Sequence, residues 1–502
     1  MFYWLASLLL VIPLLKLFDR FLRSYDSIPG PPRWPIIGNL AQFMGVGAVE
    51  IFALLADYSN RYGGIYKLDF LFDYTIVYST PEAAELILKS SNFTSKSEDY
   101  QKVAEWIGDG LLMSRGYKWL THRRVIAPGF NARVLERFVP VFSRHAETFC
   151  AKLEALMIAQ PDEPINVLPE LKLHALGVLC ETAMGVTSGE EQEKQRTYTQ
   201  AVEELNSILY WRMFDSFGTI DVLFRLTPTS RRFNELVATS RSFTHDMIDR
   251  RRKMKEKKTE KASSSNDDEV FESRKQAEPL MDTLLQARID DKALTDEEIR
   301  EEVDTFTFAG HDTTASAMTF LLYNVAKYPD VQERLYEEIT SQIGAEFSDL
   351  SMSALNDLQY MDRVIKESLR LYPPVPVVAR TATNDMLLLG QHLKRGTTVA
   401  LNIFSMHRNE EYFPDPCRFS PERFEGDDDY LIYDRYAYIP FSTGPRYCIG
   451  KKFAQYELKS TLVKVLQRFQ LRLMSVDYVP TLKAEIVLKP VEGMPLIFKR
   501  RK

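Results

Sequence analysis

The sequence has 502 residues, with 63 Lys and Arg against 69 Asp and Glu, so its formal net charge is −6. Hydrophobic residues make up 45% and charged residues 26% of the chain, which is typical of a folded globular protein and excludes collagen, bulk disorder and a multi-span membrane protein. The mild acidity argues against a nucleic-acid binder, which would carry a basic excess. The cysteines are too few and too scattered for a disulfide framework or a CxxC zinc site, and they suit a reducing compartment; they are Cys150, Cys180, Cys417 and Cys448.

The N-terminus begins with an apolar run at residues 2–15, and Lys16, Arg20 and Arg23 follow it. At ~1.5 Å per residue, a helix over 2–18 would be roughly 25 Å long, close to the thickness of a thin bilayer. A retained anchor, an interfacial helix and a cleaved signal peptide are the alternatives. No basic residue precedes the run and no small-residue cleavage site follows it, which disfavours the signal peptide. Basic residues after the run favour an anchor over residues 1–25 with the following chain in the cytosol.

Proline and glycine are dense at residues 26–40, which predicts a stiff hinge that cannot continue the N-terminal helix. Beyond the hinge we expect a single domain over 41–502, mainly α with small β-sheets, an α+β class. Residues 250–279 are rich in charge and serine and poor in apolar residues, so we expect a solvated mobile loop there rather than a domain boundary.

Hydrophobic periodicity and turn residues place the other elements. Strands are expected at 65–70, 75–78, 386–389 and 397–403, mostly helical structure at 81–248, helices at 331–343 and 362–371, and a C-terminal hairpin at 485–498 that turns near Glu492 and Gly493.

A long helix is predicted from Thr295, which can cap it with Glu298 in a capping box. No proline occurs from there to about Tyr328, so the helix exceeds thirty residues and must cross the whole molecule. Its middle, residues 306–314, contains a glycine, a carboxylate and threonines, which are poor helix formers. We expect a local break in its hydrogen-bond ladder at a functional site; a polar stripe facing solvent is the alternative.

The segment 441–450 places two glycines and a proline around Cys448, just before a helix expected from Lys451. Backbone amides in such a loop and at a helix N-terminus can stabilise a thiolate, and Arg446 adds a cation two residues earlier. A thiolate metal ligand is therefore predicted at Cys448, with a buried structural cysteine as the alternative.

These motifs together resemble the cytochrome P-450 superfamily over nearly the whole chain. The resemblance rests on the cysteine loop F-x-x-G-x-R-x-C-x-G, on E-x-x-R, on P-E-R-F, on the long-helix pattern A/G-G-x-D/E-T and on W-x-x-x-R, in the expected order and spacing. The matching residues are Phe441, Gly444, Arg446, Cys448 and Gly450; Glu367 and Arg370; Pro421 to Phe424; Ala309, Gly310, Asp312 and Thr313; and Trp119 and Arg123.

The resemblance implies a cytochrome P-450 fold with haem b between the long central helix and the cysteine loop. Cys448 is then the axial thiolate of the iron, which favours O–O cleavage. The loop residues Phe441, Gly444 and Gly450 frame the cofactor, and its propionates are expected to bind Trp119, Arg123, Arg380 and Arg446. Glu367, Arg370 and Arg423 are expected to form a buried structural ion network.

Asp312 and Thr313 are the expected catalytic pair on the distal side of the haem, where an alcohol backed by a carboxylate can relay protons. This pair favours an O2-dependent monooxygenase over the alternative, a haem-thiolate isomerase or haem-binding protein without oxygenase turnover. The sequence from Glu302 to Thr314 is similar to that of family 4, a microsomal group rich in fatty-acid ω-hydroxylases. Many of its members have glutamate before the glycine and attach haem through an ester; Ala309 excludes that link here.

No flavin or dinucleotide fingerprint is visible, so the resemblance implies electrons from NADPH through a separate membrane-bound NADPH–cytochrome reductase, with cytochrome b5 as a further donor. Lys451 and Lys452, with Arg423 and Arg435, are candidates for a basic docking patch; ordinary solvated side chains are the alternative. The expected location is the endoplasmic reticulum membrane, with the catalytic domain in the cytosol. The substrate is expected to be lipophilic: a fatty acid or related lipid, a steroid-type hormone or a xenobiotic. No nucleic-acid partner is expected.

Overall fold

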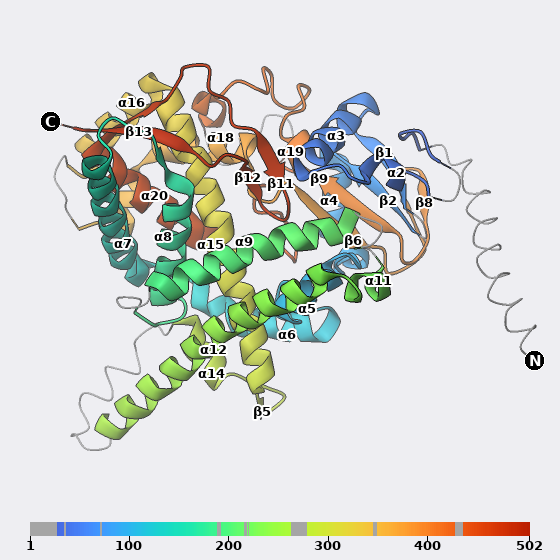
Figure 1. Ribbon diagram of the computed structural model, residues 1–502, viewed down its shortest axis with the longest axis horizontal. Coiled ribbons are helices and arrows are strands. Elements are labelled where there is room, and N and C mark those ends of the chain that lie inside the picture. The colour runs from blue at the N-terminus through green and yellow to red at the C-terminus, as the bar shows by residue number, and fades with distance from the viewer. Residues whose placement is uncertain are drawn as a thin grey trace, which may run out of the picture.

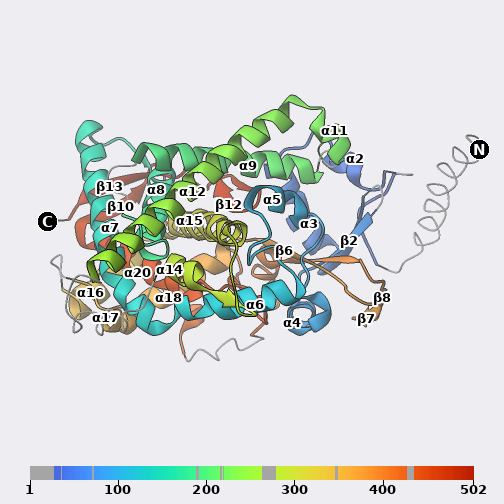
Figure 2. The same ribbon diagram turned by 90° about the horizontal axis from the view of Figure 1, so that it is seen from below.

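The computed structural model describes residues 28–34, 37–70, 73–187, 192–214, 218, 220–262, 279–344, 349–426 and 435–501. The predicted class, mainly α with small sheets, is confirmed. Helices fill one side of the molecule, and the largest sheet lies on the opposite side beside α3 (Ala48–Arg61), with the long helix α15 (Asp296–Lys327) crossing the interior (Figure 1, Figure 2).

The largest sheet has the strand order β1-β2-β9-β6. Strands β2 and β9 run parallel, and the other pairs are antiparallel. The strands are β1 (Ile65–Phe70), β2 (Asp73–Tyr78), β9 (Thr398–Asn402) and β6 (Val377–Thr381). The predicted strands at 65–70, 75–78 and 397–403 are thus confirmed, and β-branched residues such as Ile76 and Val399 supply their buried face.

The smaller sheets hold the C-terminal strands and three ribbons. One has the order β10-β13-β3, and the others are the pairs β11–β12, β4–β5 and β7–β8. Their bounds are β10 (Phe469–Leu473), β13 (Pro495–Arg500), β3 (Ile165–Asn166), β11 (Leu482–Ala484), β12 (Leu488–Pro490), β4 (Arg288–Ile289), β5 (Lys292–Ala293), β7 (Met386–Leu388) and β8 (Gln391–Leu393).

The single C-terminal hairpin predicted at 485–498 is wrong. Strand β12 pairs with β11, and β13 pairs with β10 and β3 instead of with β12. Residues 485–487 therefore form the turn, and Gly493 lies in the connection between two different sheets, with a left-handed φ of 77°. Two apolar runs separated by a glycine resemble a hairpin locally, but their partners come from elsewhere in the chain.

Helices before the long central one form the covering layers. They are α2 (Leu40–Phe43), α3 (Ala48–Arg61), α4 (Pro81–Lys89), α5 (Tyr100–Ile107), α6 (Gly116–Ile126), α7 (Ala132–Ala159), α8 (Val167–Thr182), α9 (Gln192–Phe214), α11 (Asp221–Arg225), α12 (Pro228–Ala262) and α14 (Leu280–Gln286). The later helices are α15 (Asp296–Lys327), α16 (Pro329–Gln342), α17 (Met352–Asp357), α18 (Gln359–Leu371), α19 (Ile403–Met406) and α20 (Lys451–Arg468), and short 3₁₀ helices occupy Ser91–Phe93, Ala127–Phe130 and Pro421–Phe424.

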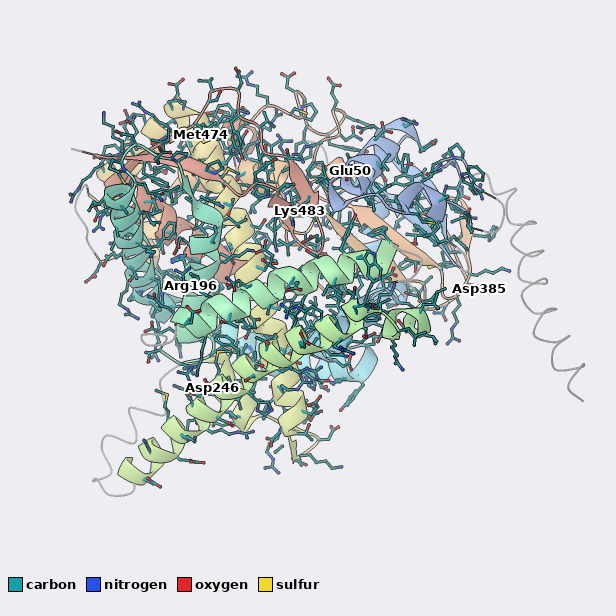
Figure 3. The ribbon with its side chains drawn as sticks, viewed as in Figure 1. Glu50, Arg196, Asp246, Asp385, Met474 and Lys483 are labelled. Atoms are coloured by element: carbon teal, nitrogen blue, oxygen red, sulfur yellow. The ribbon has the colours of Figure 1, made fainter. Side chains whose placement is uncertain are left out.

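The charged segment 250–279 differs from the predicted loop. Helix α12 continues to Ala262, so residues 250–262 are helical, while 263–278 lie outside the described residues. Lys, Arg and Glu are good helix formers, and an ion pair between Arg251 and Asp282 of α14 holds this part of α12. Earlier in α12, Asp246, which is labelled in Figure 3, pairs with Lys194 of α9 at 2.9 Å.

The long helix α15 begins after the predicted capping box, in which Thr295 and Glu298 bond each other's backbone. Its second half is buried on nearly every face, as expected for a helix that crosses the core. The predicted break at 306–314 is wrong, since α15 is helical throughout. Gly310 serves close packing instead: a Cβ there would lie 3.0 Å from the Leu179 side chain of α8.

The proline-rich segment predicted as a hinge at 26–40 is fastened to the sheet over its described residues. The amide of Lys67 donates to the carbonyl of Pro29 at 2.9 Å, and a Cβ at Gly30 would lie 2.4 Å from the Lys67 carbonyl oxygen. The packed domain therefore begins by residue 28 rather than at 41. The predicted anchor at 1–25 lies outside the described residues, and no helix within the described ranges is long and apolar enough to cross a membrane.

Candidate functional site

A tight loop presents Cys448 immediately before α20. The Cys448 amide donates to the Phe441 carbonyl at 2.9 Å, and Tyr447 N donates to the Gly444 carbonyl at 3.1 Å. Gly444 has a φ of 69°, and a Cβ there would lie 2.0 Å from the Leu88 carbonyl oxygen of α4. Only glycine fits this position, which explains why the loop motif has glycine at residue 444. Gly450 is the N-cap residue of α20.

The side chain of Cys448 is accessible, whereas Cys150 and Cys180 are buried. Its sulfur nevertheless lies deep enough for burial to raise the pKa of the thiol, while the Gly450 amide and the charges of Arg123 and Lys451 act in the opposite direction. A bound metal cation would deprotonate such a thiol.

Arg446 does not act on this thiol as the sequence suggested. Its guanidinium donates to the carbonyls of Thr94, Leu111 and Ser114 at 3.0, 3.3 and 2.6 Å. It also stacks on the Trp119 ring, with 4.1 Å between Cζ and the ring centroid. Arg446 therefore joins the cysteine loop to the segment between α5 and α6.

The predicted anion-binding residues gather in one cationic region. Burial and the charges of Arg380 and Arg123 lower the pKa of Arg446 to about 9. Arg123 has a buried Nη2 without a hydrogen-bond partner, and its guanidinium lies 4.5 Å from the Tyr447 ring centroid. Arg380 is 2% exposed, and within the described chain it donates only to the neighbouring Ala379 carbonyl. Unpaired buried cations of this kind require an anion.

Arg115 belongs to the same region and was not identified from the sequence. Its Nη1 pairs with Glu98 at 3.0 Å, but Nε and Nη2 are buried without partners. It is the N-cap residue of α6, one turn before Trp119. Its position four residues before the W-x-x-x-R motif was the available signal, since residues at this spacing lie on one helix face.

These residues fit a haem. An accessible thiol would be able to ligate the iron of such a group as a thiolate, and under-bonded arginines would suit its two propionates. Cys448 would hold the iron, and Arg123, Arg380, Arg446 and Trp119 would border the propionates. When bound, a haem with a thiolate ligand supplies the chemistry of O2 activation.

The three residues predicted as an ion network meet behind the cysteine loop. Arg370 donates to Glu367 through Nε and Nη2 at 2.7 and 2.8 Å, and both side chains are fully buried. Arg423 donates to Glu367 Oε1 at 3.2 Å. Arg370 also donates to the backbone carbonyls of His407 and Pro416. The network thereby fixes α18 against the chain that leads to the cysteine loop.

The two residues of the predicted catalytic pair on α15 lie in different environments. Thr313 is partly accessible, and its hydroxyl donates to the Ala309 carbonyl at 2.7 Å. Asp312 is 1% exposed, and its Oδ2 accepts from Asn206 of α9 at 2.9 Å and lies 3.0 Å from Lys489 Nζ. Consecutive helix residues point about 100° apart, and no hydrogen bond joins the two side chains in the described structure.

Asp312 is held as a carboxylate. Burial alone would raise its pKa, but Lys489, Lys172 and His311 outweigh burial and lower the pKa to about 2. Lys489 was not identified from the sequence, because its β12 position gives no local signal for this contact.

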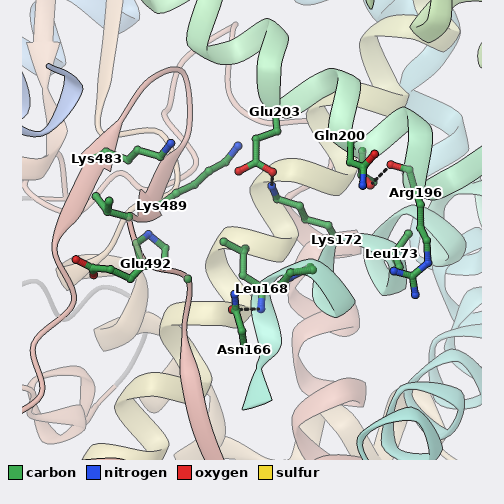
Figure 4. Close-up of a pocket in the computed structure, with 15 residues that line it drawn as sticks. Asn166, Leu168, Lys172, Leu173, Arg196, Gln200, Glu203, Lys483, Lys489 and Glu492 are labelled. Carbon is green, nitrogen blue, oxygen red and sulfur yellow. Dashed lines mark hydrogen bonds and ion pairs between the residues drawn. The ribbon is translucent and has the colours of Figure 1, made fainter. Parts of the chain in front are cut away.

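Lys489 also lines a pocket of about 300 Å³ between α8, α9 and the β11–β12 ribbon. Figure 4 shows Lys172, Lys489 and Lys483 converging on Glu203, with Lys172 and Glu203 paired at 2.9 Å. The three lysines lower the pKa of Glu203 against the effect of burial. A chain of alternating charges thus leads from this pocket to Asp312.

Two further carboxylates of α15 hold the segment between α5 and α6. Glu301 accepts from the Asp109 amide at 2.8 Å, and Glu302 accepts from the Leu111 amide at 3.0 Å and contacts His122 Nδ1 at 2.7 Å. The backbone of this segment therefore donates to α15 and accepts from Arg446. The start of α6, the helix that carries Trp119 and Arg123, is therefore positioned by α15 and by the cysteine loop.

Known proteins resemble this chain over nearly its whole length. The sequence model of the family "Cytochrome P450" matches residues 28–497. The chain is similar to cytochrome P450 4d2 of Drosophila melanogaster, at 37% identity over 98% of both chains. It is also similar to cytochrome P450 4d1 of the same organism, at 35% identity over 96% of this chain and 95% of the relative. Cytochrome P450 4c21 of Blattella germanica is 33% identical, over 95% of this chain and 94% of the relative.

Proposed function

Because the chain belongs to the cytochrome P450 family of haem monooxygenases, we propose that it inserts one atom of O2 into a lipophilic substrate with electrons from NADPH. The observation that carries the proposal is the accessible Cys448 thiol in its glycine-bounded loop, close to arginines with unpaired nitrogens. A thiolate ligand and a set of propionate-binding cations are what a haem monooxygenase needs from its protein.

The cofactor is haem b, held by Cys448 and by non-covalent contacts. Position 309 is alanine, which has no carboxylate for an ester to a haem methyl. The cofactor is therefore retained by the thiolate, by the arginines and by packing alone.

The substrate we propose is a fatty acid or a related lipid, with steroid-type hormones and xenobiotics as the other classes. Support comes from the resemblance to family 4, which is rich in fatty-acid ω-hydroxylases, and from the family 4 relatives. Burial of apolar surface is the main source of affinity for such substrates.

Proton handling is assigned to Thr313 and Asp312. The Thr313 hydroxyl can release its bond to the Ala309 carbonyl and turn toward a bound group, and water can link it to the buried carboxylate. Asp312 stays ionised at neutral pH and can accept a proton from the side of Lys489 and the pocket. Thr313 is the residue that would contact bound oxygen.

The electron donor we propose is a separate NADPH–cytochrome reductase, with cytochrome b5 as a further donor. Lys451 and Lys452 are exposed at the start of α20, and Leu120 and Tyr447 are exposed apolar residues of α6 and the cysteine loop. Arg423 is committed to Glu367 and is a poor docking residue. A basic rim with an apolar centre suits an acidic redox partner.

We place the protein at the endoplasmic reticulum membrane, with residues 1–25 as a single anchor and the catalytic domain in the cytosol. The support is the sequence alone, namely the apolar run and the basic residues after it. Deletion of residues 2–25 should lower membrane association and leave haem binding intact.

Carbon monoxide difference spectroscopy tests the ligand assignment. The reduced wild-type protein should show the strongly red-shifted Soret band of a thiolate opposite CO. Cys448→Ser should remove this band, whereas Cys417→Ser, which changes the other accessible cysteine, should keep it. A band that survives Cys448→Ser would overturn the site.

Turnover separates the monooxygenase from a haem-thiolate protein without oxygenase activity. Purified protein with reductase, NADPH and a panel of fatty acids, steroids and xenobiotics should consume O2 and NADPH in a substrate-dependent way. A protein that shows the thiolate band and isomerises peroxides without NADPH would contradict the proposed reaction. Displacement of the ferric iron's water ligand by each compound would identify the substrate class.

A further inference from the structure

Two buried side-chain atoms near the end of α9 have no hydrogen-bond partner in the part of the chain that the structure describes. One is the hydroxyl oxygen of Tyr210, a residue that is 8% exposed. The other is Oε2 of Glu485, in the turn between β11 and β12, with a side chain that is 7% exposed. A buried polar atom without a partner destabilises the fold, so each of the two points to a group that binds there.

Ser207 of α9 brings these two atoms together. Its Oγ donates to Glu485 Oε1 at 2.7 Å, and Lys483 Nζ lies 3.2 Å from the same oxygen. These contacts use one oxygen of the carboxylate and leave Oε2 free. Ser207 and Tyr210 are three residues apart, so they lie on one face of α9. The free carboxylate oxygen and the phenol are therefore neighbours where α9 meets the β11–β12 ribbon (Figure 1, Figure 2).

The charges around Tyr210 are negative. Burial raises the pKa of its phenol above the ordinary value, and the charges of Glu485 and Glu50 raise it further. The phenol is therefore neutral at physiological pH and can donate its proton in a hydrogen bond. A carboxylate ligand at this position would be repelled by both glutamates.

Apolar side chains surround this polar pair. Tyr210 belongs to a buried cluster with Phe43 of α2, and its ring lies 4.8 Å from that of Phe214 between centroids. Val377 and Ala379 of the edge strand β6 pack against the same cluster and are half-buried. Half-buried apolar side chains beside an unpaired phenol suit an apolar ligand that carries one polar group.

Strand β6 connects this region with the predicted cofactor residues. Alternate residues of a strand point to opposite faces, and the burial along β6 alternates accordingly, with Val377 and Ala379 on one face and the buried Arg380 on the other. A group bound by Tyr210 therefore lies at the border of the cofactor site and not at its centre. Only a molecule with an extended apolar body can bind there and also reach the cofactor.

We propose that Tyr210 and Glu485 together bind a hydroxyl group of the substrate, so that the substrate is a lipid alcohol and not a free fatty acid. A hydroxyl accepts from the Tyr210 O–H and donates to Glu485 Oε2, which gives both buried atoms a partner. An ether or a ketone can only accept, and a carboxylate is also repelled. The inference rests on the lipophilic substrate proposed above and narrows it to alcohols.

Spin-shift titration of the ferric holoprotein tests the pair. The probes are a long-chain primary alcohol and the methyl ether, carboxylic acid and alkane of the same chain length. The wild type should bind the alcohol about tenfold more tightly than the ether, which cannot donate to Glu485. Tyr210→Phe should weaken binding of the alcohol and the ether about tenfold and leave the alkane unchanged. Glu485→Gln should weaken binding of the alcohol but strengthen binding of the acid, because the repulsion is removed.

Tyr198→Phe is the matched control. Tyr198 is another buried tyrosine of α9, and its ring packs on Phe243 of α12 at 4.6 Å between centroids, so its loss should change none of these affinities. Thermal unfolding provides a second measure, since the stabilisation by the alcohol should be smaller in Tyr210→Phe than in wild type. The opposite changes for acid and alcohol in Glu485→Gln are a result that general loosening of the fold would not give.

A second series, a steroid-type alcohol and the corresponding ketone, distinguishes ring lipids from chain lipids. The series in which Tyr210→Phe weakens binding of the alcohol identifies the kind of alcohol. If Tyr210→Phe changes the affinities for alcohol and alkane equally, or changes neither, the two buried atoms hold a water molecule only and the proposal is wrong. Tighter binding of the acid than of the alcohol by wild type would also overturn it.

The CO band and NADPH consumption keep the two levels of inference apart. A wild-type protein that shows the thiolate band and substrate-dependent NADPH consumption, but no preference for an alcohol, contradicts the role of Tyr210 and Glu485 only. Loss of the band in wild type contradicts the haem-thiolate assignment itself.

Discussion

Asp312 and Lys489 form a buried ion pair, with 3.0 Å between Oδ2 and Nζ and side-chain exposures of 1% and 2%. The pair joins the middle of α15 to β12. Asn206 of α9 completes it at 2.9 Å from the same oxygen. The acid of the A/G-G-x-D/E-T motif is therefore directed away from Thr313, toward the charged pocket shown in Figure 4.

The first prediction concerns this pair. Lys489→Met should lower the free energy of unfolding by about 3–5 kcal/mol, because it leaves a buried carboxylate without its counterion. The double variant Lys489→Met/Asp312→Asn should recover much of that loss. Urea unfolding of the four proteins of the cycle measures the coupling. Lys194→Met is the control, since its partner Asp246 lies at 2.9 Å and both side chains are exposed. Additive effects of the two buried changes would contradict the pair.

Thr313→Ala should keep haem and substrate binding but divert NADPH electrons to hydrogen peroxide, because the hydroxyl that handles protons is lost. Product formation should fall by about tenfold to a hundredfold. The ratio of peroxide to product measures the effect. Thr319→Ala is a matched control, since its hydroxyl donates to the Ala315 carbonyl at 2.7 Å in the same way, six residues further along α15. Equal uncoupling in both variants would show that the backbone bond, and not proton handling, is responsible.

Acid should destabilise the protein through buried histidines. Burial lowers the pKa of His174 to about 3, so the folded protein excludes a proton that the unfolded chain binds below pH ~6.5. The contribution of His174 is complete above that pH and declines as pH falls, by about 2 kcal/mol at pH 5. His174→Gln can keep the bond to Thr461 Oγ1. In this variant the free energy of unfolding should fall less between pH 7 and 5, because the proton taken up by His174 on unfolding is removed. The exposed His392→Gln should leave the slope unchanged.

Removing one partner from the Glu367 network should strongly destabilise the folded protein, because the network is buried. Glu367→Gln leaves Arg370 fully buried without an anion, so the yield of haem-loaded protein should collapse, with a cost of about 3–5 kcal/mol. The surface pair of Arg334 and Glu422, at 3.0 Å and half exposed, provides the contrast. Arg334→Gln should change the thermal midpoint little, because exposed pairs contribute about 0–1 kcal/mol. Thermal unfolding with Soret detection distinguishes the two.

Short-range chemistry explains what could be predicted from the sequence. The cap of α15 depends on Thr295 and Glu298 three residues apart, and the cysteine loop depends on Gly444 and its left-handed φ. Both are local requirements that fix residue type and spacing. For the same reason α20 begins at Lys451, as the sequence indicated.

Contacts between distant segments explain what could not be predicted. The partner of Asp312 lies on β12, and the strands expected to form one hairpin belong to two sheets. Residues 250–262 looked like a loop by composition, yet Asp282 of α14 holds Arg251 on the helix. Each case depends on tertiary packing, which overrides local propensity.

The final prediction concerns Ala309. With no carboxylate at this position, acidified organic solvent should extract all of the haem from the wild-type protein, even after many turnovers. Ala309 and Thr313 are four residues apart and joined by the hydroxyl-to-carbonyl bond at 2.7 Å, so they lie on one face of α15. Ala309→Glu should therefore place a carboxylate on the face that bears Thr313 and permit partial ester formation during turnover with reductase and NADPH. Ala309→Gln has the same size and cannot form the ester, so its haem should stay fully extractable. If the substrate is a fatty acid, the wild type should give in-chain as well as terminal products. Haem that resists extraction from the wild type would mean that another side chain is esterified.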